Sequence, residues 1–239
     1  MSYKKLFITI LTALFFFISC QKDGSFEDGK AAFERKEYVS AMKILRPLAT
    51  KGDVKAQNLI GFMYDEGDGV PQDYSEAAKW YRMAAEQGDA DAQFFLGNMY
   101  DEGKGVSQNL AEAAKWYRKS AEHGDVKAQL ILGSMYQDGN GVSQDETEAF
   151  KWYSKASEQG DVDAQFFLGI MYHDGKGVPR DDILSYMWFN LASSKWPENE
   201  KNVASEFRDD IARIMAPAQI SEARRLSDAW KLKFKKNSE

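Results

Sequence analysis

Apolar positions along the chain fall into a helical pattern that returns four times between residues 56 and 195. In one copy, Ala92, Phe95, Leu96, Met99 and Tyr100 lie at i, i+3, i+4, i+7 and i+8, the spacing of one face of an α-helix. A second apolar face follows a glycine-rich break and comprises Ala113, Ala114, Trp116, Tyr117 and Ala121. Each copy therefore predicts two helices, here called helix A and helix B.

The copies follow one another at a step of 36 residues without insertion. Their first residues are Ala56, Ala92, Ala128 and Ala164, and the same step separates Trp80, Trp116, Trp152 and Trp188. A fixed period of roughly 20 to 50 residues is typical of solenoids. Because one hairpin cannot bury both of its faces alone, successive hairpins are expected to stack. The predicted fold class is all-α: an α/α solenoid of antiparallel helix hairpins.

Polar residues and glycines mark where these helices begin and end. An aspartate, a good N-cap, precedes each helix A, at Asp53, Asp89, Asp125 and Asp161. A Gly-x-Gly loop ends helix A, and Asp73, Asn109 or Asp145 then caps helix B. A glycine also recurs inside helix A, at Gly61, Gly97, Gly133 and Gly169. Since glycine weakens a helix by about 1 kcal/mol, we expect the helix B alanines (Ala77, Ala113, Ala149) to approach closely there. The tryptophans are expected in the core.

These residues carry a resemblance to a known family. The shared pattern in one copy is Ala92, Leu96, Gly97, Tyr100, Gly103, Gly105, Val106, Asn109, Ala113, Trp116, Tyr117, Ala121 and Gly124. It resembles the Sel-one-like repeat, a relative of the tetratricopeptide repeat, over residues 56–195. Departures are small: Ile60 replaces the leucine of the first unit, and Phe189 replaces the tyrosine of the last. The resemblance implies a right-handed α/α superhelix with a concave face for proteins or peptides.

The first residues predict export. Lys4 and Lys5 precede an apolar run from Leu6 to Ile18, which is too short for a bilayer span of about 20 residues and fits the layout of a signal peptide. Residues 17–20, Phe-Ile-Ser-Cys, resemble a bacterial lipobox, which implies that Cys20 carries the lipid. An ordinary cleaved signal or an uncleaved anchor is the alternative. With Gln21 next, the resemblance favours the outer membrane, facing the periplasm, or the cell surface.

The remaining segments flank the repeats. Residues 1–19 form the predicted signal, 20–25 a polar tether, 26–52 an N-terminal capping helix pair, 53–195 the four repeats and 196–239 C-terminal capping helices. Pro217 is expected to begin the last helix, because proline is tolerated in a first turn.

Composition and motifs argue against several other functions. A net charge of −6 without a basic stripe argues against nucleic acid as a partner. Cys20 is the single cysteine, and the two histidines, His123 and His173, fall in different copies, so the sequence predicts no zinc site, no other metal and no cofactor. Ser40-x-x-Lys43 matches one motif of penicillin-recognising enzymes, but its companion motifs are missing. The sequence thus predicts a protein that is not an enzyme.

One face of helix A differs between copies and is the candidate binding face. Its members are Asn58, Phe62, Phe94, Asn98, Leu130, Ser134, Phe166, Ile170 and His173. These side chains either line an open groove or pack between neighbouring A helices. The favoured function is a non-catalytic scaffold of the bacterial envelope that binds a protein or peptide on this face. Alternatives are an enzyme or receptor directed at penicillin or peptidoglycan, and a regulator of an envelope enzyme.

Overall fold

A computed structural model describes residues 24–196 and 202–238, and Cys20 and the predicted signal lie outside this part. Twelve helices and no strand occur in the described residues. The chain divides into two compact units, Met1–Ala84 and Ala85–Glu239, which we call unit 1 and unit 2 and describe separately.

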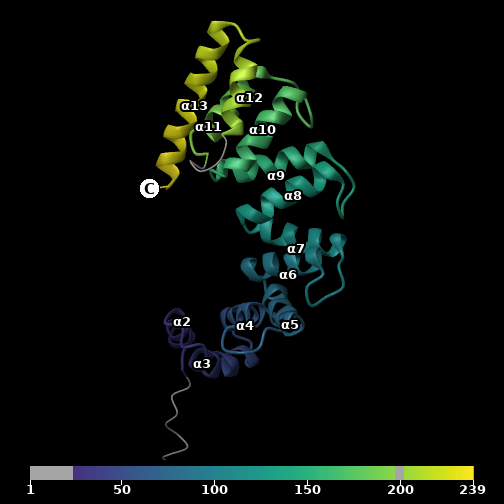
Figure 1. Ribbon diagram of the computed structural model, residues 1–239, viewed down its shortest axis with the longest axis vertical. Coiled ribbons are helices and arrows are strands. Elements are labelled where there is room, and N and C mark those ends of the chain that lie inside the picture. The colour runs from purple at the N-terminus through teal and green to yellow at the C-terminus, as the bar shows by residue number, and fades with distance from the viewer. Residues whose placement is uncertain (1–23, 197–201, 239) are drawn as a thin grey trace, which may run out of the picture. The chain divides into compact units, whose positions relative to one another are not determined.

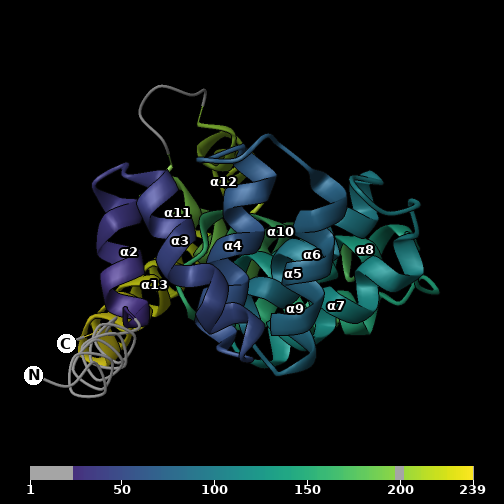
Figure 2. The ribbon, with the colours of Figure 1, turned by 90° about the horizontal axis from the view of Figure 1, so that it is seen from below.

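Unit 1 consists of helices packed in chain order. Its helices are α2 (Phe26–Glu34), α3 (Tyr38–Thr50), α4 (Val54–Glu66) and most of α5 (Tyr74–Glu86), which crosses the unit boundary. Figure 2 shows α2, α3 and α4 side by side, and each of these pairs is in contact. The first helix begins with a capping box, in which the side chains of Ser25 and Asp28 bond each other's backbone N–H. Such a box satisfies donors that a helix N-terminus leaves unpaired.

Unit 2 contains three helix A/helix B hairpins and two closing helices. The hairpins are α6 (Ala90–Glu102) with α7 (Leu110–Glu122), α8 (Val126–Asp138) with α9 (Glu146–Glu158), and α10 (Val162–Asp174) with α11 (Asp182–Ser193). Each helix B also packs against the next helix A. Two further helices, α12 (Val203–Ala212) and α13 (Pro217–Ser238), pack against α11, and Figure 1 shows α13 running alongside it. As predicted, Pro217 begins the last helix.

The predicted caps are confirmed. Each aspartate before helix A accepts a hydrogen bond from a backbone N–H three residues later, at 2.7 to 2.8 Å. Each helix A ends at a glycine with φ between 69° and 78°, a left-handed conformation that glycine adopts without steric cost. Asn109, Asp145 and Asp181 cap the B helices of unit 2 with their side chains.

The mid-helix glycines make room for an aromatic ring, which corrects the expectation that helix B alanines approach there. A Cβ added to Gly97 would lie 2.7 Å from Cδ1 of Tyr117, a buried side chain. The same relation joins Gly61 with Tyr81, Gly133 with Tyr153 and Gly169 with Phe189, at 2.6 to 2.7 Å. The alanines Ala77, Ala113 and Ala149 are buried, but the atoms nearest to the glycine belong to the ring four positions further along helix B.

The tryptophans only partly fulfil the prediction that they form the core. Trp152 is 2% exposed, whereas Trp80, Trp116 and Trp188 are half-buried. The half-buried ring of Trp116 is in contact with a lysine, since Lys119 Nζ lies 3.9 Å from its ring centroid. The aromatic residue one position later is buried in all four copies, as Tyr81, Tyr117, Tyr153 and Phe189, whereas the tryptophan is buried only at Trp152.

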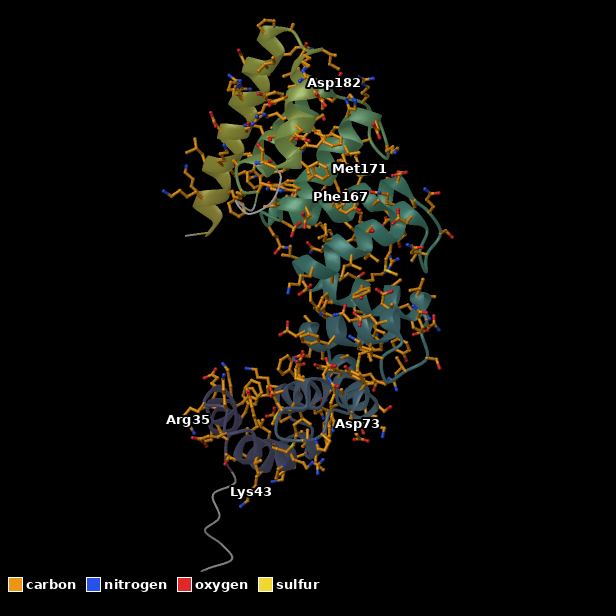
Figure 3. The ribbon with its side chains drawn as sticks, in the orientation of Figure 1. Arg35, Lys43, Asp73, Phe167, Met171 and Asp182 are labelled. Atoms are coloured by element: carbon orange, nitrogen blue, oxygen red, sulfur yellow. The ribbon has the colours of Figure 1, made fainter. Side chains whose placement is uncertain are left out.

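Neighbouring hairpins interlock through aromatic and apolar side chains. The rings of Tyr153 on α9 and Phe167 on α10 stack with centroids 4.9 Å apart and an interplanar angle of 18°. Figure 3 labels Phe167 together with Met171, which is 2% exposed in the same core. Each hairpin thus completes the core of its neighbour, as expected for a repeat that cannot bury both faces alone.

Candidate protein-binding face

The nine residues predicted to bind a partner lie at corresponding positions of successive A helices, and we call them the helix A face. All nine are half-buried. Two, Asn58 and Phe62, belong to unit 1, and the other seven belong to unit 2. Their surroundings differ from one helix to the next, so each group is described separately.

The unit 1 part of the face is packed against the N-terminal helix pair. The rings of Phe62 and Phe33 on α2 make a T-shaped contact, with centroids 5.9 Å apart. The ring of Phe33 also contacts Tyr38 on α3, with centroids 5.4 Å apart. Phe62 therefore contributes to the stability of this pair, and only part of its surface is open.

The last part of the face is covered by the chain itself. The ring of Phe166 lies between 5.4 and 5.6 Å, centroid to centroid, from those of Phe189, Trp196 and Phe207. Phe207 comes from α12, and Phe166 and Ile170 pack against the cluster of buried residues that α12 shares with α11. At this end the apolar surface packs against the C-terminal part of the chain and does not form an open groove.

Two polar members of the face, Asn98 and Ser134, are hydrogen-bonded within the chain. Tyr117 donates its hydroxyl to Oδ1 of Asn98 at 2.7 Å, and Ser134 donates more weakly to Asp138 at 3.4 Å. Burial, reinforced by the carboxylate of Asp101, raises the pKa of Tyr117. The phenol is therefore a fixed neutral donor, and Asn98 orients its amide towards it.

His173 is held by the first turn of the following helix. Its Nδ1 lies 2.9 Å from Oδ1 of Asp182, and Arg180 donates to Oδ2 of the same carboxylate at 3.0 Å. Burial acts to raise the pKa of Asp182, but the hydrogen bonds from Arg180 and His173 outweigh it and lower that pKa. The carboxylate therefore stays ionised and fixes the imidazole at the end of α10.

Phe94 lines an open hollow. Its ring contacts Phe95 and Tyr117, with centroids 5.7 and 5.9 Å apart, and its remaining surface faces a hollow of about 410 Å³ between α6 and the start of α8. The full lining is Asp91, Phe94, Phe95, Gly124, Asp125, Val126 and Lys127. Apolar side chains form the floor, and the exposed Asp91 and Lys127 add opposite charges at the rim. Such a mixture suits one anchoring side chain of a partner.

The structure also reveals a repeated polar contact that the sequence reading missed. A glutamine follows the alanine that opens each copy (Ala56, Ala92, Ala128 and Ala164). Its Nε2 donates to a backbone carbonyl eight residues earlier, in the last turn of the preceding helix. Gln93, for example, is 3% exposed and reaches the carbonyl of Ala85 at 3.0 Å. Its Oε1 also lies 3.0 Å from Nδ1 of His123. Because the last carbonyls of a helix lack partners within it, this glutamine joins adjacent hairpins. The sequence did contain a signal for this contact, because a glutamine recurs at 36-residue steps directly after a buried alanine.

Two properties of the described residues bear on alternative functions. Nowhere between residues 24 and 196 or 202 and 238 do three or more histidine, cysteine, aspartate or glutamate side chains gather as a metal site would require. Within the same ranges, each helix is too short or too polar to span a bilayer. Ser40 and Lys43, of the penicillin-type motif, are both exposed on α3.

Comparison with known families identifies the repeat. The model of the Sel1 repeat matches residues 54–89, 90–125, 126–161 and 162–195. The chain belongs to the Sel1 repeat family. Sel1 repeat proteins are generally non-catalytic scaffolds that bind other proteins. Among curated proteins, none matches the chain.

Two solved structures are similar to this Sel1 repeat protein. A Sel1 repeat protein from Oxalobacter formigenes is 30% identical with a TM-score of 0.71, and the match covers 90% of this chain and 100% of that one. The protein c5321, a protective antigen present in uropathogenic Escherichia coli strains, is 32% identical with a TM-score of 0.69 over 85% of this chain. This chain spans about half (49%) of c5321. Both comparisons confirm the predicted α/α solenoid.

Proposed function

We propose that this Sel1 repeat protein is a non-catalytic scaffold of the bacterial envelope, which binds a protein or peptide through the part of the helix A face around Phe94. The observation that carries the proposal is the hollow beside Phe94. The equivalent position two repeats later, Phe166, is already filled by an aromatic side chain of the chain itself. Phe94 thus has a hollow beside it, whereas rings of the chain itself cover Phe166.

The difference between the two sites comes from the helix that follows each of them. Beyond Phe166, α12 places the ring of Phe207 at a centroid distance of 5.4 Å. Beyond Phe94, α8 begins with Val126 and Lys127 at the edge of the hollow. Valine is too short to fill the space, and lysine keeps its charge in water. An aromatic or large aliphatic side chain of a partner would bury apolar surface there, which is how anchoring residues contribute most of the affinity of an interface.

The envelope location rests on the first residues of the sequence. The short apolar run after Lys4 and Lys5 and the lipobox-like segment ending at Cys20 support export and lipid attachment, with the outer membrane favoured. The E. coli relative is a protective antigen, which supports an address outside the cytoplasm. Lipid attachment predicts that a Cys20→Ser variant is released from membranes by a carbonate wash, whereas the unchanged chain stays bound. A variant that remained bound would contradict the lipid anchor.

The binding site is tested by site-specific photo-cross-linking in living cells. A photoreactive phenylalanine analogue replaces Phe94 in one variant, and Ala111, an exposed residue on the outside of α7, in the matched control. The proposal expects discrete cross-linked products at position 94 that are absent at position 111, and that disappear when Val126→Arg fills the hollow. Identical products at both positions, or none at position 94, would refute this site.

A further inference from the structure

The outer face of α3 differs from the equivalent faces of the helices α5, α7 and α9. At the step of 36 residues, Ser40 and Thr50 correspond to positions at which α5, α7 and α9 all carry glutamate: Glu76, Glu112 and Glu148 for the first, and Glu86, Glu122 and Glu158 for the second. A third position changes in the same direction, because Lys51 corresponds to the residues Gln87, His123 and Gln159. At these three positions two negative charges are absent and one positive charge is added. Elsewhere on the face Pro47 corresponds to Lys119 and Lys155, and Arg46 corresponds to Ser154, so the α3 face is two to three unit charges more positive than its counterparts on α5, α7 and α9.

Because the first of these glutamates is replaced by Ser40, Lys43 has no acidic residue three positions before it on α3. In α5, α7 and α9, the lysine at this position forms an ion pair with the glutamate three residues before it, at 2.5 to 2.9 Å. Lys43 has Ser40 there instead. The nearest acidic residue at the start of α3, Glu37, is already paired with Arg35 at 2.9 Å. A basic surface therefore stands out on a chain whose net charge is −6.

Apolar groups lie among these basic side chains. Val39 is 73% exposed, and a hollow of about 640 Å³ on this face is lined by Val39, Met42, Lys43, Arg46, Pro47, Thr50 and Lys51. Figure 3 shows Lys43 pointing away from the helices of unit 1. Basic side chains around exposed apolar groups suit a lipid surface with anionic headgroups, which attracts the charges and accommodates the apolar groups at its boundary.

We propose that this basic face of α3 rests on the anionic phospholipid headgroups of the membrane that holds the chain, a proposal that rests on the lipid anchor at Cys20. Gly24 lies against Ile44 of α3, and only four residue steps separate it from Cys20. Four steps reach at most about 14 Å, so an acylated Cys20 keeps α3 next to the headgroups. Attraction between exposed charges acts over about 8 Å at physiological salt, and the tether is long enough to allow a separation that small.

The test compares the chemical reactivity of Lys43 with that of its repeat counterpart, Lys115. The acylated full chain is reconstituted on vesicles of phosphatidylcholine, with or without phosphatidylglycerol, and treated with a membrane-impermeant amine reagent. Modification of each lysine is then followed by peptide mass spectrometry. Each basic residue near an anionic surface adds about fivefold to the affinity. We therefore expect modification of Lys43 to fall about fivefold or more when phosphatidylglycerol is present, while Lys115 is unaffected, and high salt to restore it.

Restoring the glutamates of the other repeats provides the matched variant. Ser40→Glu with Thr50→Glu introduces residues that α5, α7 and α9 already carry at these exposed positions, so folding is preserved. The double variant is expected to abolish the protection of Lys43. Equal reactivity of Lys43 on both vesicle types would overturn the proposal, as would protection found only in native envelopes, which would indicate a protein partner.

Failure of the anchor is detected separately. The intact mass shows whether Cys20 is acylated. If it is not, its thiol is coupled to a maleimide phospholipid on the same vesicles, and the Lys43 measurement then decides whether the face binds headgroups. Protection under these conditions would support the α3 face while rejecting the natural lipid anchor, and its absence would reject both.

Discussion

Substituting Gly97 with alanine tests whether the ring of Tyr117 is what requires glycine inside helix A. Two opposing effects act at this position. Alanine is favoured over glycine within a helix by about 1 kcal/mol. The added methyl group, however, would lie 2.7 and 2.8 Å from two ring carbons of Tyr117. That ring is 1% exposed and donates to Asn98, so it cannot swing away freely.

The magnitude follows from the difference between these effects. Forcing an extra methyl group into a packed core costs about 1 to 3 kcal/mol. After the gain in helix propensity of about 1 kcal/mol is subtracted, Gly97→Ala should lower the free energy of unfolding by up to about 2 kcal/mol. In a Tyr117→Ala background the ring is gone and only the propensity remains. There the same substitution should raise the free energy of unfolding by about 1 kcal/mol.

Urea unfolding followed by far-UV circular dichroism measures all four members of this double-mutant cycle. An Ala229→Gly variant, at an exposed position of α13, measures the propensity effect without a packing partner. The predicted signature is a change of sign between the two backgrounds. If Gly97→Ala stabilised the unchanged chain as strongly as Ala229→Gly weakens it, the ring would not be the reason for the glycine.

Two further predictions concern hydrogen-bonded side chains. Gln93→Ala removes one of two hydrogen bonds to the carbonyl of Ala85, which also accepts from the backbone N–H of Gly88 at 3.1 Å, and should lower the free energy of unfolding by about 0.5 to 1.5 kcal/mol, measured by urea unfolding. The exposed Gln108, whose amide also bonds a backbone carbonyl, is the control, and an equal loss for Gln108→Ala would argue against the role of burial. Asp182→Asn should reduce stability at neutral pH, because the pKa of Asp182 is lowered in the folded chain. The Asp182 carboxylate stabilises the folded chain at pH values above its unfolded pKa of about 3.9. This contribution to the free energy of unfolding is lost as the pH falls through the lower pKa of the folded chain. The thermal unfolding temperatures of the variant and the unchanged chain should therefore converge below about pH 4. A gap that persisted in acid would rule out the charge of Asp182 as its cause.

Much of the fold follows from the sequence because the determining signals are local and repeated. The aspartate before each helix A and the glycine after it fix where the helix begins and ends, and both were readable at 36-residue steps. What occupies the space above Gly97 was not readable, because both Ala113 and Tyr117 lie on the same face of helix B. Only the rotation of that helix against helix A places the ring, not the alanine, over the glycine.

The candidate site was less predictable, because it depends on contacts between distant segments. Phe94 and Phe166 are identical residues at equivalent positions, and the sequence left open whether each is exposed. Phe207, forty-one residues after Phe166, decides the answer for one of them. For the other, the deciding feature is the small size of Val126 across the hollow. No periodic pattern carries this information, because the repeat ends before Phe207.

The glutamine that joins adjacent hairpins has a consequence for how such a gene changes length. Ala85 and Ala121 offer chemically equivalent carbonyls, and Gln93 and Gln129 bond them in the same way. Recombination that removes or duplicates one 36-residue block would therefore create a new junction between hairpins in which the glutamine still bonds an equivalent alanine carbonyl. Loss of a single codon has no such protection, because it rotates one helix by about 100° relative to its neighbours. We therefore expect selection to tolerate the gain or loss of whole 36-residue units and to eliminate in-frame deletions of one or a few residues within a helix.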